Sequence, residues 1–262
     1  MFATSTEPPG LPQQRPADVT LVPLRLDLAE ARLRELEPLL SPAERDRAAR
    51  LVPRAAQRFI AGRGQLRQLL GRLVGAAPEA LEFEAGPAGK PVLGGRHAGG
   101  WQFNVSHSQD RGLVACSAAL PVGIDLECVA ATHTTAWADD LAGSILGAGE
   151  HVAYRLLPGP DRPRALVEAW VAKEALLKAT GAGVAAGVRH VLLPAPLPRA
   201  TIIAAAPPTR APLAAVAGLG PGSWAVCLLD LGPDVRAALA CPRAECRIAL
   251  EEGWDGRPPP GG

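Results

Sequence analysis

Residues 103–127 read FNVSHSQDRGLVACSAALPVGIDLE and end in two carboxylates on alternate residues. If residues 122–127 form a strand, the side chains alternate, so Asp125 and Glu127 share one face and the apolar residues share the other. Two like charges about 7 Å apart along a strand repel each other, and oxygen-only ligands suit magnesium. The pattern therefore predicts a bound magnesium ion and a third carboxylate further along the chain.

The third carboxylate is predicted at Glu174, in the segment WVAKEALLKATGAG. We expect a helix over residues 163–180, with Asp161 as its N-cap and Gly181 after its end. Its buried stripe turns ionic toward the C-terminus: Val167, Trp170, Val171, Glu174 and Lys178. An isolated Glu and Lys four residues apart usually form a surface pair, and Trp170 alone indicates core packing. Because Glu174 and Lys178 continue an apolar stripe, we expect them to point into a cleft.

Composition narrows the class of protein. The chain has 262 residues and a formal charge of +1, so no overall charge attracts it to nucleic acid or to a membrane. No apolar segment has the length of a membrane span, and the N-terminus has no signal-peptide pattern. Its five cysteines lack CxxC spacing, which indicates neither a zinc site nor a disulfide framework. We expect a cytoplasmic protein that binds neither nucleic acid nor membrane.

The order of the expected elements repeats along the chain. Helices followed by strands fill residues 19–120, and a similar series fills residues 121–232. This repeat predicts an α+β fold of two similar subdomains packed face to face, with the site between them, in a monomer. Residues 1–18 are proline-rich and polar, so we expect disorder there, and residues 233–262 read as a Pro/Gly-rich tail.

Local patterns give finer expectations. Residues 106–108 should form a turn, and Leu120-Pro121 should connect two strands as a hairpin. Ser41 and Glu44 form a capping box with proline at the first helical position. The expected helices are residues 28–40, 42–51, 54–74, 137–146, 150–157 and 163–180. The expected strands are residues 19–26, 81–85, 101–105, 113–119, 122–127, 188–193, 200–206 and 224–231.

Several of these segments together resemble a known family. VGIDLE and WVAKEALLK are similar to the paired motifs of the 4′-phosphopantetheinyl transferases, and more narrowly to those of the Sfp type. The resemblance also includes RFIAGRGQLR, GKPVL, FNVSHS and SWAVCLL, in the family's order, and covers about residues 47–230. It implies two subdomains related by a pseudo-twofold axis, with the active site at their interface.

The resemblance also implies a reaction. Such an enzyme transfers the 4′-phosphopantetheine arm of coenzyme A to a serine of an apo acyl or peptidyl carrier protein. The products are the holo carrier protein and 3′,5′-ADP, and the reaction depends on magnesium. Asp125, Glu127 and Glu174 would hold the metal, while Glu174 and Lys178 would be catalytic. Whether Glu174 acts as ligand, as base or as both is left open by the sequence.

The coenzyme contacts also follow from the resemblance. It implies that Ser106 and His107 contact phosphate and that Lys90 lies at the adenosine end. Arg58 and Arg63 would meet the 3′-phosphate. Taken alone, His107 after a strand is more often a turn or capping residue, and Lys90 is a solvated loop charge.

Lysine is rare in this chain. Of its 27 basic residues only Lys90, Lys173 and Lys178 are lysines, and all three lie in the matched segments. A compact ammonium acts on phosphate as a point charge, which is a reason to keep lysine at such a site. We therefore include Lys173 among the coenzyme contacts, at the rim of the site.

Two other classes of function compete with a transferase. A binding module that has lost its chemistry would be expected to have lost the acids first, but Asp125, Glu127 and Glu174 are all present. A small kinase or nucleotidyltransferase should carry a phosphate-binding loop. The segment EAGPAGKP lacks the Ser or Thr that follows the lysine in such a loop.

Overall fold

The computed structural model describes most of the chain. The described residues are 17–86, 89–130, 132–183, 187–195, 197–201, 208–216, 219 and 223–252. The predicted disorder of residues 1–18 lies outside these ranges except at its last two residues. Residues 253–262 of the predicted tail, and residues 202–206 of one predicted strand, also lie outside them.

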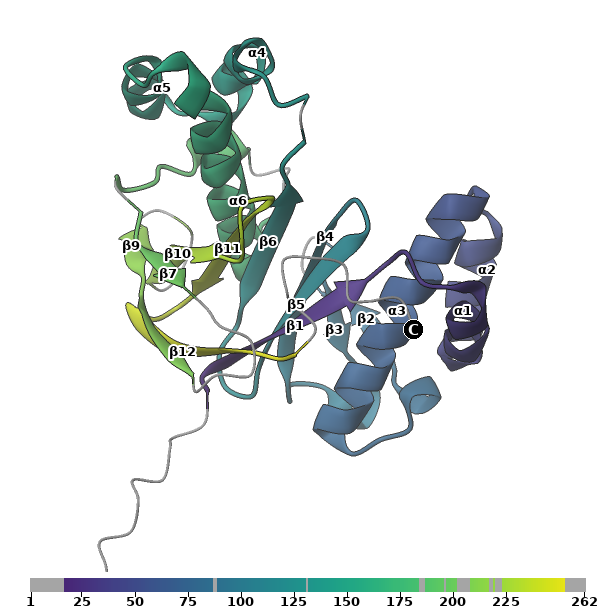
Figure 1. Cartoon of the computed structure of the whole chain (residues 1–262). Helices are drawn as coiled ribbons and strands as arrows, with labels where there is room; N and C mark the ends of the chain where they lie inside the picture. The colour runs from purple at the N-terminus through teal and green to yellow at the C-terminus, as the bar shows by residue number, and fades with distance from the viewer. Residues whose placement is uncertain are drawn as a thin grey trace, which may run out of the picture.

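Helices α1 to α3 cover the first of two large sheets (Figure 1). Their apolar sides meet the sheet in one core, where Leu66 and Leu70 pack near Val22 and Val114. The helices are α1 (Glu30–Leu36), α2 (Pro42–Ala49) and α3 (Pro53–Val74). The sheet, in spatial order, is β4 (Gln102–Ser108), β5 (Arg111–Ser117), β1 (Val19–Arg25), β12 (Glu245–Leu250) and β8 (Thr209–Pro212).

The second sheet packs against the long helix α6 (Figure 1). Its strands, in order, are β6 (Gly123–Cys128), β11 (Val235–Cys241), β10 (Trp224–Asp230) and β7 (Arg199–Thr201), with β9 (Ala214–Val216) also paired to β10. Its helices are α4 (Thr135–Ile145), α5 (Ala148–Arg155) and α6 (Arg162–Thr180). A small hairpin, β2 (Phe83–Ala85) with β3 (Pro91–Leu93), and the short 3₁₀ helices Glu37–Leu39, Pro78–Ala80, Gly95–His97, Gly159–Asp161 and Val188–His190 complete the described structure.

The inner faces of the two sheets form a third core. It joins Leu21 and Leu113 of the first sheet with Ile124 and Leu239 of the second. The layers therefore run helix, sheet, sheet, helix, which confirms the predicted α+β class. The pseudo-twofold axis and the division at residue 120 stay predictions. Strands β8 and β12 return to the first sheet, so the later part of the chain completes the earlier layer.

One glycine sets the distance between β6 and α6. A Cβ on Gly123 would lie 2.0 Å from the carbonyl oxygen of Ala175 and 2.4 Å from the amide nitrogen of Ala179. No other residue type permits so close an approach of strand and helix. The absence of a side chain at Gly123 thus brings the acids of β6 next to the ionic end of α6.

Local signals placed most helices correctly. Ser41 and Glu44 form the predicted capping box, and helices α3 and α6 end at Gly75 and Gly181 in the left-handed conformation. The predicted N-cap at Asp161 is wrong, because its side chain makes no capping hydrogen bond and its backbone is already helical.

Four strand predictions need correction. Residues 106–108 form no turn but continue β4, whose backbone pairs with β5 up to Ser108. The Leu120-Pro121 hairpin is wrong, because β5 and β6 belong to different sheets. The expected strand over residues 188–193 is instead a 3₁₀ helix followed by irregular chain. The expected tail after residue 232 contains β11 and β12, which pair with β6 and β1.

No helix in the described ranges is both long enough and apolar enough to cross a lipid bilayer.

Candidate active site

A cavity of about 240 Å³ lies where β4, β6 and α6 meet. Its lining residues come from two segments that are distant in the sequence, residues 105–127 and 170–178. They are Val105, Ser106, His107, Asp125, Glu127, Trp170, Glu174 and Lys178. The alternation of β6 and the four-residue spacing on α6 explain this convergence. Trp170 packs against the core between α6 and the second sheet, and it also lines the cavity.

Asp125 is the most heavily contacted acid of this cavity. The ammonium of Lys178 lies 2.6 Å from Asp125 Oδ1, and the Ser106 hydroxyl donates to the same oxygen at 2.6 Å. The Lys178 ammonium also lies 3.1 Å from Ser106 Oγ. Ser106, predicted to contact phosphate, is buried and is used here to hold Asp125.

Glu127 has a matching partner that sequence reasoning missed. The Ser108 hydroxyl donates to Glu127 Oε2 at 2.7 Å and accepts a hydrogen bond from the Cys128 amide at 3.1 Å. The signal that could have revealed Ser108 is the alternation of Asn104, Ser106 and Ser108 along β4. Such a series of short polar side chains on one strand face predicts a polar neighbour.

Two buried carboxylate oxygens beside this cavity receive no hydrogen bond from the described residues. They are Asp125 Oδ2 and Glu174 Oε1. Burial raises the pKa of Glu174 above its ordinary value, the charge of Asp125 raises it further, and Lys178 opposes both. Buried carboxylate oxygens without donors are unfavourable in isolation, so a cation would stabilise them.

The donor set fits magnesium in chemistry. Asp125, Glu127 and Glu174 offer only oxygen ligands, and two of their oxygens accept no hydrogen bond from the part of the chain that the structure describes. As placed, no three His, Cys, Asp or Glu side chains of the described ranges are close enough together to hold a metal ion. Lys178 supplies the positive charge at Asp125 in this arrangement.

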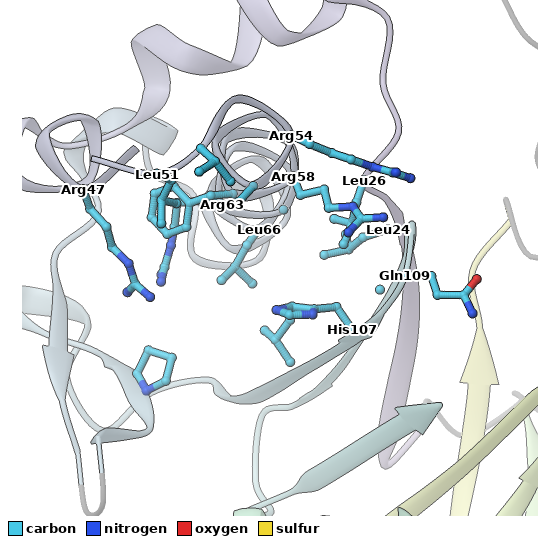
Figure 2. A pocket seen from close by; sticks show the side chains of 17 residues that line it. Leu24, Leu26, Arg47, Leu51, Arg54, Arg58, Arg63, Leu66, His107 and Gln109 are labelled. Atoms are coloured by element: carbon cyan, nitrogen blue, oxygen red, sulfur yellow. The ribbon is translucent and has the colours of Figure 1, made fainter. Parts of the chain in front are cut away.

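A second cavity, of about 690 Å³, lies under helix α3 and is rich in arginine. Arg54, Arg58 and Arg63 project into it from α3, and Arg47 from α2 (Figure 2). His107 faces them from β4. His107 and Val105 line both cavities, so the acidic and the basic cavity adjoin.

The predicted arginines already have acidic partners. Arg58 binds Asp110 with two nitrogens, at 2.8 and 2.6 Å. Arg63 lies 3.4 Å from Glu44 and 5.0 Å from the ring centroid of Phe83, and burial lowers its pKa. These contacts fix both guanidinium groups at the wall of the cavity.

Lys90 lies apart from both cavities. Its ammonium donates to the carbonyl oxygen of Val122 at 2.8 Å, and burial lowers the pKa of Lys90 to about 8. The residue thereby ties the β2–β3 hairpin to the start of β6.

Lys173 does not face the site, so its prediction as a coenzyme contact is wrong. Its side chain is fully buried, and its ammonium contacts Glu150 at 2.6 Å and the carbonyl oxygen of Ile145 at 2.8 Å. One helical position advances the side chain by about 100°, which turns Lys173 away from the cavity that Glu174 lines. Lys173 joins α6 to α4 and α5 instead.

A family model and individual relatives both indicate the same family for this chain. Residues 121–215 match the family described as ACPS, 4′-phosphopantetheinyl transferase superfamily. The chain is 39% identical to the 4′-phosphopantetheinyl transferase HetI of Nostoc sp., over 64% of this chain and 70% of the relative. It is 36% identical to a protein of Synechocystis sp. provisionally named a 4′-phosphopantetheinyl transferase, over 60% of this chain and 63% of that one.

A more distant relative comes from another bacterium. The 4′-phosphopantetheinyl transferase psf-1 of Bacillus pumilus is 29% identical over 65% of this chain and 70% of its own length. The identity with HetI extends over more than two thirds of that relative, and the family match includes Asp125, Glu127, Glu174 and Lys178. On this evidence the chain is an enzyme of the 4′-phosphopantetheinyl transferase superfamily.

Proposed function

We propose that this enzyme, of the Sfp type, transfers the 4′-phosphopantetheine arm of coenzyme A to a serine of an apo carrier protein in a magnesium-dependent reaction. The observation that carries the proposal is the shared wall of the two cavities, formed by Val105 and His107. An arginine-rich cavity next to an acidic one matches a coenzyme with a phosphorylated nucleotide at one end and a reacting pyrophosphate beyond it. The products are the holo carrier protein and 3′,5′-ADP.

The basic cavity would hold the nucleotide. Arg58 and Arg63 are held at its wall by Asp110 and Glu44, and their remaining guanidinium N–H groups would bind a phosphate. His107 lies between the cavities and would contact the phosphate bridge. Ser106 would contribute indirectly, because its hydroxyl holds the Asp125 carboxylate in place. Lys90 would also contribute indirectly, because its ammonium binds the carbonyl oxygen of Val122 at the start of β6.

In the reaction the serine oxygen forms a bond to the β-phosphorus of coenzyme A, while the bond from that phosphorus to 3′,5′-ADP breaks. Glu174 would accept the serine proton, directly or through water. Its raised pKa brings its basicity closer to the working pH than that of an exposed glutamate. Lys178, one turn along α6, would stabilise negative charge that grows at the attacked phosphate.

Asp125, Glu127 and Glu174 would hold magnesium, which neutralises pyrophosphate charge when bound. Asp125 could contact the cation through Oδ2, which is not the oxygen that Lys178 contacts. The positive charge of the cation would weaken the pair between Asp125 and Lys178 and so release the Lys178 ammonium toward the phosphates. The two halves of the site lie in one chain, which supports a monomer, and the five buried free thiols support a cytoplasmic location.

Mass spectrometry of an apo carrier protein tests the proposal. The enzyme is mixed with coenzyme A, magnesium and the carrier, and the carrier should gain the mass of one phosphopantetheine group. Omission of magnesium, or addition of a chelator, should abolish the gain. A binding module would leave the carrier unchanged, and a kinase would add only a phosphate and require a nucleoside triphosphate.

A further inference from the structure

Strands β4 and β6 are the facing edges of the two sheets, and side chains join them. Each strand pairs through its backbone with a neighbour in its own sheet, β4 with β5 and β6 with β11. Across the junction, three side chains of β4 accept hydrogen bonds from alternate amides of β6. We name Asn104, Ser106 and Ser108 together the edge triad.

The contacts of the edge triad repeat at intervals of two residues. Asn104 Oδ1 accepts from the Ile124 amide at 2.9 Å. Ser106 Oγ accepts from the Leu126 amide at 3.3 Å. Ser108 Oγ accepts from the Cys128 amide at 3.1 Å. Side chains of period two on one strand thus match amides of period two on the other.

The two serines make a second contact that Asn104 cannot make. Ser106 donates its one hydroxyl hydrogen to Asp125 at 2.6 Å, and Ser108 donates to Glu127 at 2.7 Å. In each case the acid directly precedes the residue whose amide binds the same serine. A single serine oxygen therefore fixes both the backbone and the carboxylate of a two-residue unit. At the Asn104 position the corresponding residue is Gly123, which has no side chain to orient.

We propose that Ser108 is a positioning residue for the metal site: its hydroxyl orients the carboxylate of Glu127 before the cation binds. Ser108 lines neither cavity and would touch neither coenzyme nor metal. Its effect would pass through Glu127, as hydrogen bonds to metal-ligating groups commonly do. The inference rests on the proposed function, because it assumes that Glu127 is a ligand.

The edge triad provides its own control. Asn104→Ala removes a contact between the same two strands without removing a bond to any acid. Ser108→Ala removes both the strand contact and the bond to Glu127, whereas Ser108→Thr keeps the hydroxyl and suits a strand. The comparison separates the orientation of a carboxylate from the general stability of the junction.

Binding of Mn²⁺ to the full chain, followed by electron paramagnetic resonance of the free ion, is the readout. We expect Ser108→Ala to weaken Mn²⁺ binding by about 10- to 100-fold, the range usual for lost partners of metal ligands. Asn104→Ala should lower Tm and keep Mn²⁺ affinity within about twofold of the wild type, since it loses a strand contact but no bond to an acid. Ser108→Thr should restore most of the affinity. If Ser108→Ala does not fold, Ser108→Cys, with a weaker donor of similar size, should give an intermediate affinity.

Two results would overturn the inference. One is wild-type Mn²⁺ affinity in folded Ser108→Ala or Ser108→Cys, and the other is an equal loss of affinity in Asn104→Ala. Carrier modification by the wild type, measured in parallel, separates this failure from that of the proposed function. If the wild type neither binds Mn²⁺ nor modifies the carrier, both the inference about Ser108 and the proposed function are wrong.

Discussion

Two faces of helix α6 carry the same kind of ion pair with different consequences. Lys178 lies 2.6 Å from Asp125 and Lys173 lies 2.6 Å from Glu150. The side chain of Lys178 is 29% exposed and lines a cavity, whereas that of Lys173 is 0% exposed and also binds a backbone carbonyl. Five helical residues rotate the direction of a side chain by about 140° net, so the two lysines serve different surfaces.

The difference shows how a functional ion pair can be distinguished from a structural one. Beside Lys178, Asp125 and Glu174 each keep a buried oxygen that has no hydrogen-bond donor among the described residues. Beside Lys173, both carboxylate oxygens of Glu150 have donors, because Glu150 also accepts hydrogen bonds from the amides of Gly147 and Leu193. Acceptors without donors next to a cavity are typical of a binding site, whereas an acid whose acceptors are all used by the protein is typical of core packing.

The largest effect is expected at the acids of the cavity face. Asp125→Ala should abolish transfer, because the site loses a proposed ligand and the partner of Lys178 and Ser106. Stability should change little, since the freed Lys178 ammonium is partly exposed to water. Carrier mass gain and thermal melting of the same preparation measure both effects. Wild-type turnover at saturating magnesium would remove Asp125 from the metal site.

The next effect is expected at Lys178 itself. Lys178→Ala should lower the rate of transfer by about two to three orders of magnitude, with less change in coenzyme A affinity, because the opposing charge grows in the transition state. Lys178→Arg should recover only part of this rate, since a planar guanidinium directs its charge differently. Single-turnover kinetics together with coenzyme A binding distinguish rate from affinity. Normal turnover with weakened binding would make Lys178 a ground-state contact.

On the opposite face the effect should be on stability. Lys173→Met leaves Glu150 without its counterion and should cost about 3–5 kcal/mol, the usual range for breaking a buried pair. The folded variant should transfer phosphopantetheine at the wild-type rate at a temperature well below its Tm. Adding Glu150→Gln removes the unpaired charge and keeps an acceptor for one of the two amides, which bind different oxygens of Glu150, so the double variant should regain part of the lost stability. A lowered transfer rate in the stable double variant would contradict the purely structural role.

Replacement of the third lysine, Lys90, should give the smallest effect, a change in how the Tm depends on pH. The pKa of Lys90 is about 8 in the folded chain against an ordinary 10.5. Between these values the unfolded chain binds more protons, so the contribution of Lys90 to stability rises with pH through this window. Lys90→Met lacks this rise, and any Tm advantage it has over the wild type below pH 8 should shrink by a few degrees toward pH 10.5. Parallel Tm profiles of the two proteins would contradict the burial of the Lys90 ammonium.

The acids and Lys178 could be predicted because each depends on local periodicity. Alternation on β6 and the four-residue spacing on α6 specify which side chains share a face, and in the structure Asp125, Glu127, Glu174 and Lys178 line one cavity. The prediction that Lys173 contacts the coenzyme was wrong, because the position of a residue within a motif does not specify the direction of its side chain. Ser108 was missed because its partner Glu127 lies across the junction of two sheets.

The strands after residue 232 were missed for a related reason. β11 and β12 consist of short apolar runs within a Pro- and Gly-rich stretch, so the local signal resembles a tail. β11 pairs with the preceding strand β10 and with β6, and β12 pairs with β8 and with β1; the partners β6 and β1 lie more than 100 residues earlier. Tertiary pairing of this kind overrides local composition.

A crystal structure with coenzyme A and Mn²⁺, with the metal located by its anomalous signal, most directly tests the claim that the two adjoining cavities form one active site. We expect the metal among Asp125, Glu127 and Glu174, the pyrophosphate beside His107 and the 3′-phosphate near Arg58 or Arg63. Lys178 should have left Asp125 for a phosphate oxygen, and Lys173 should still contact Glu150. A metal peak elsewhere, or coenzyme bound away from both cavities, would contradict the claim.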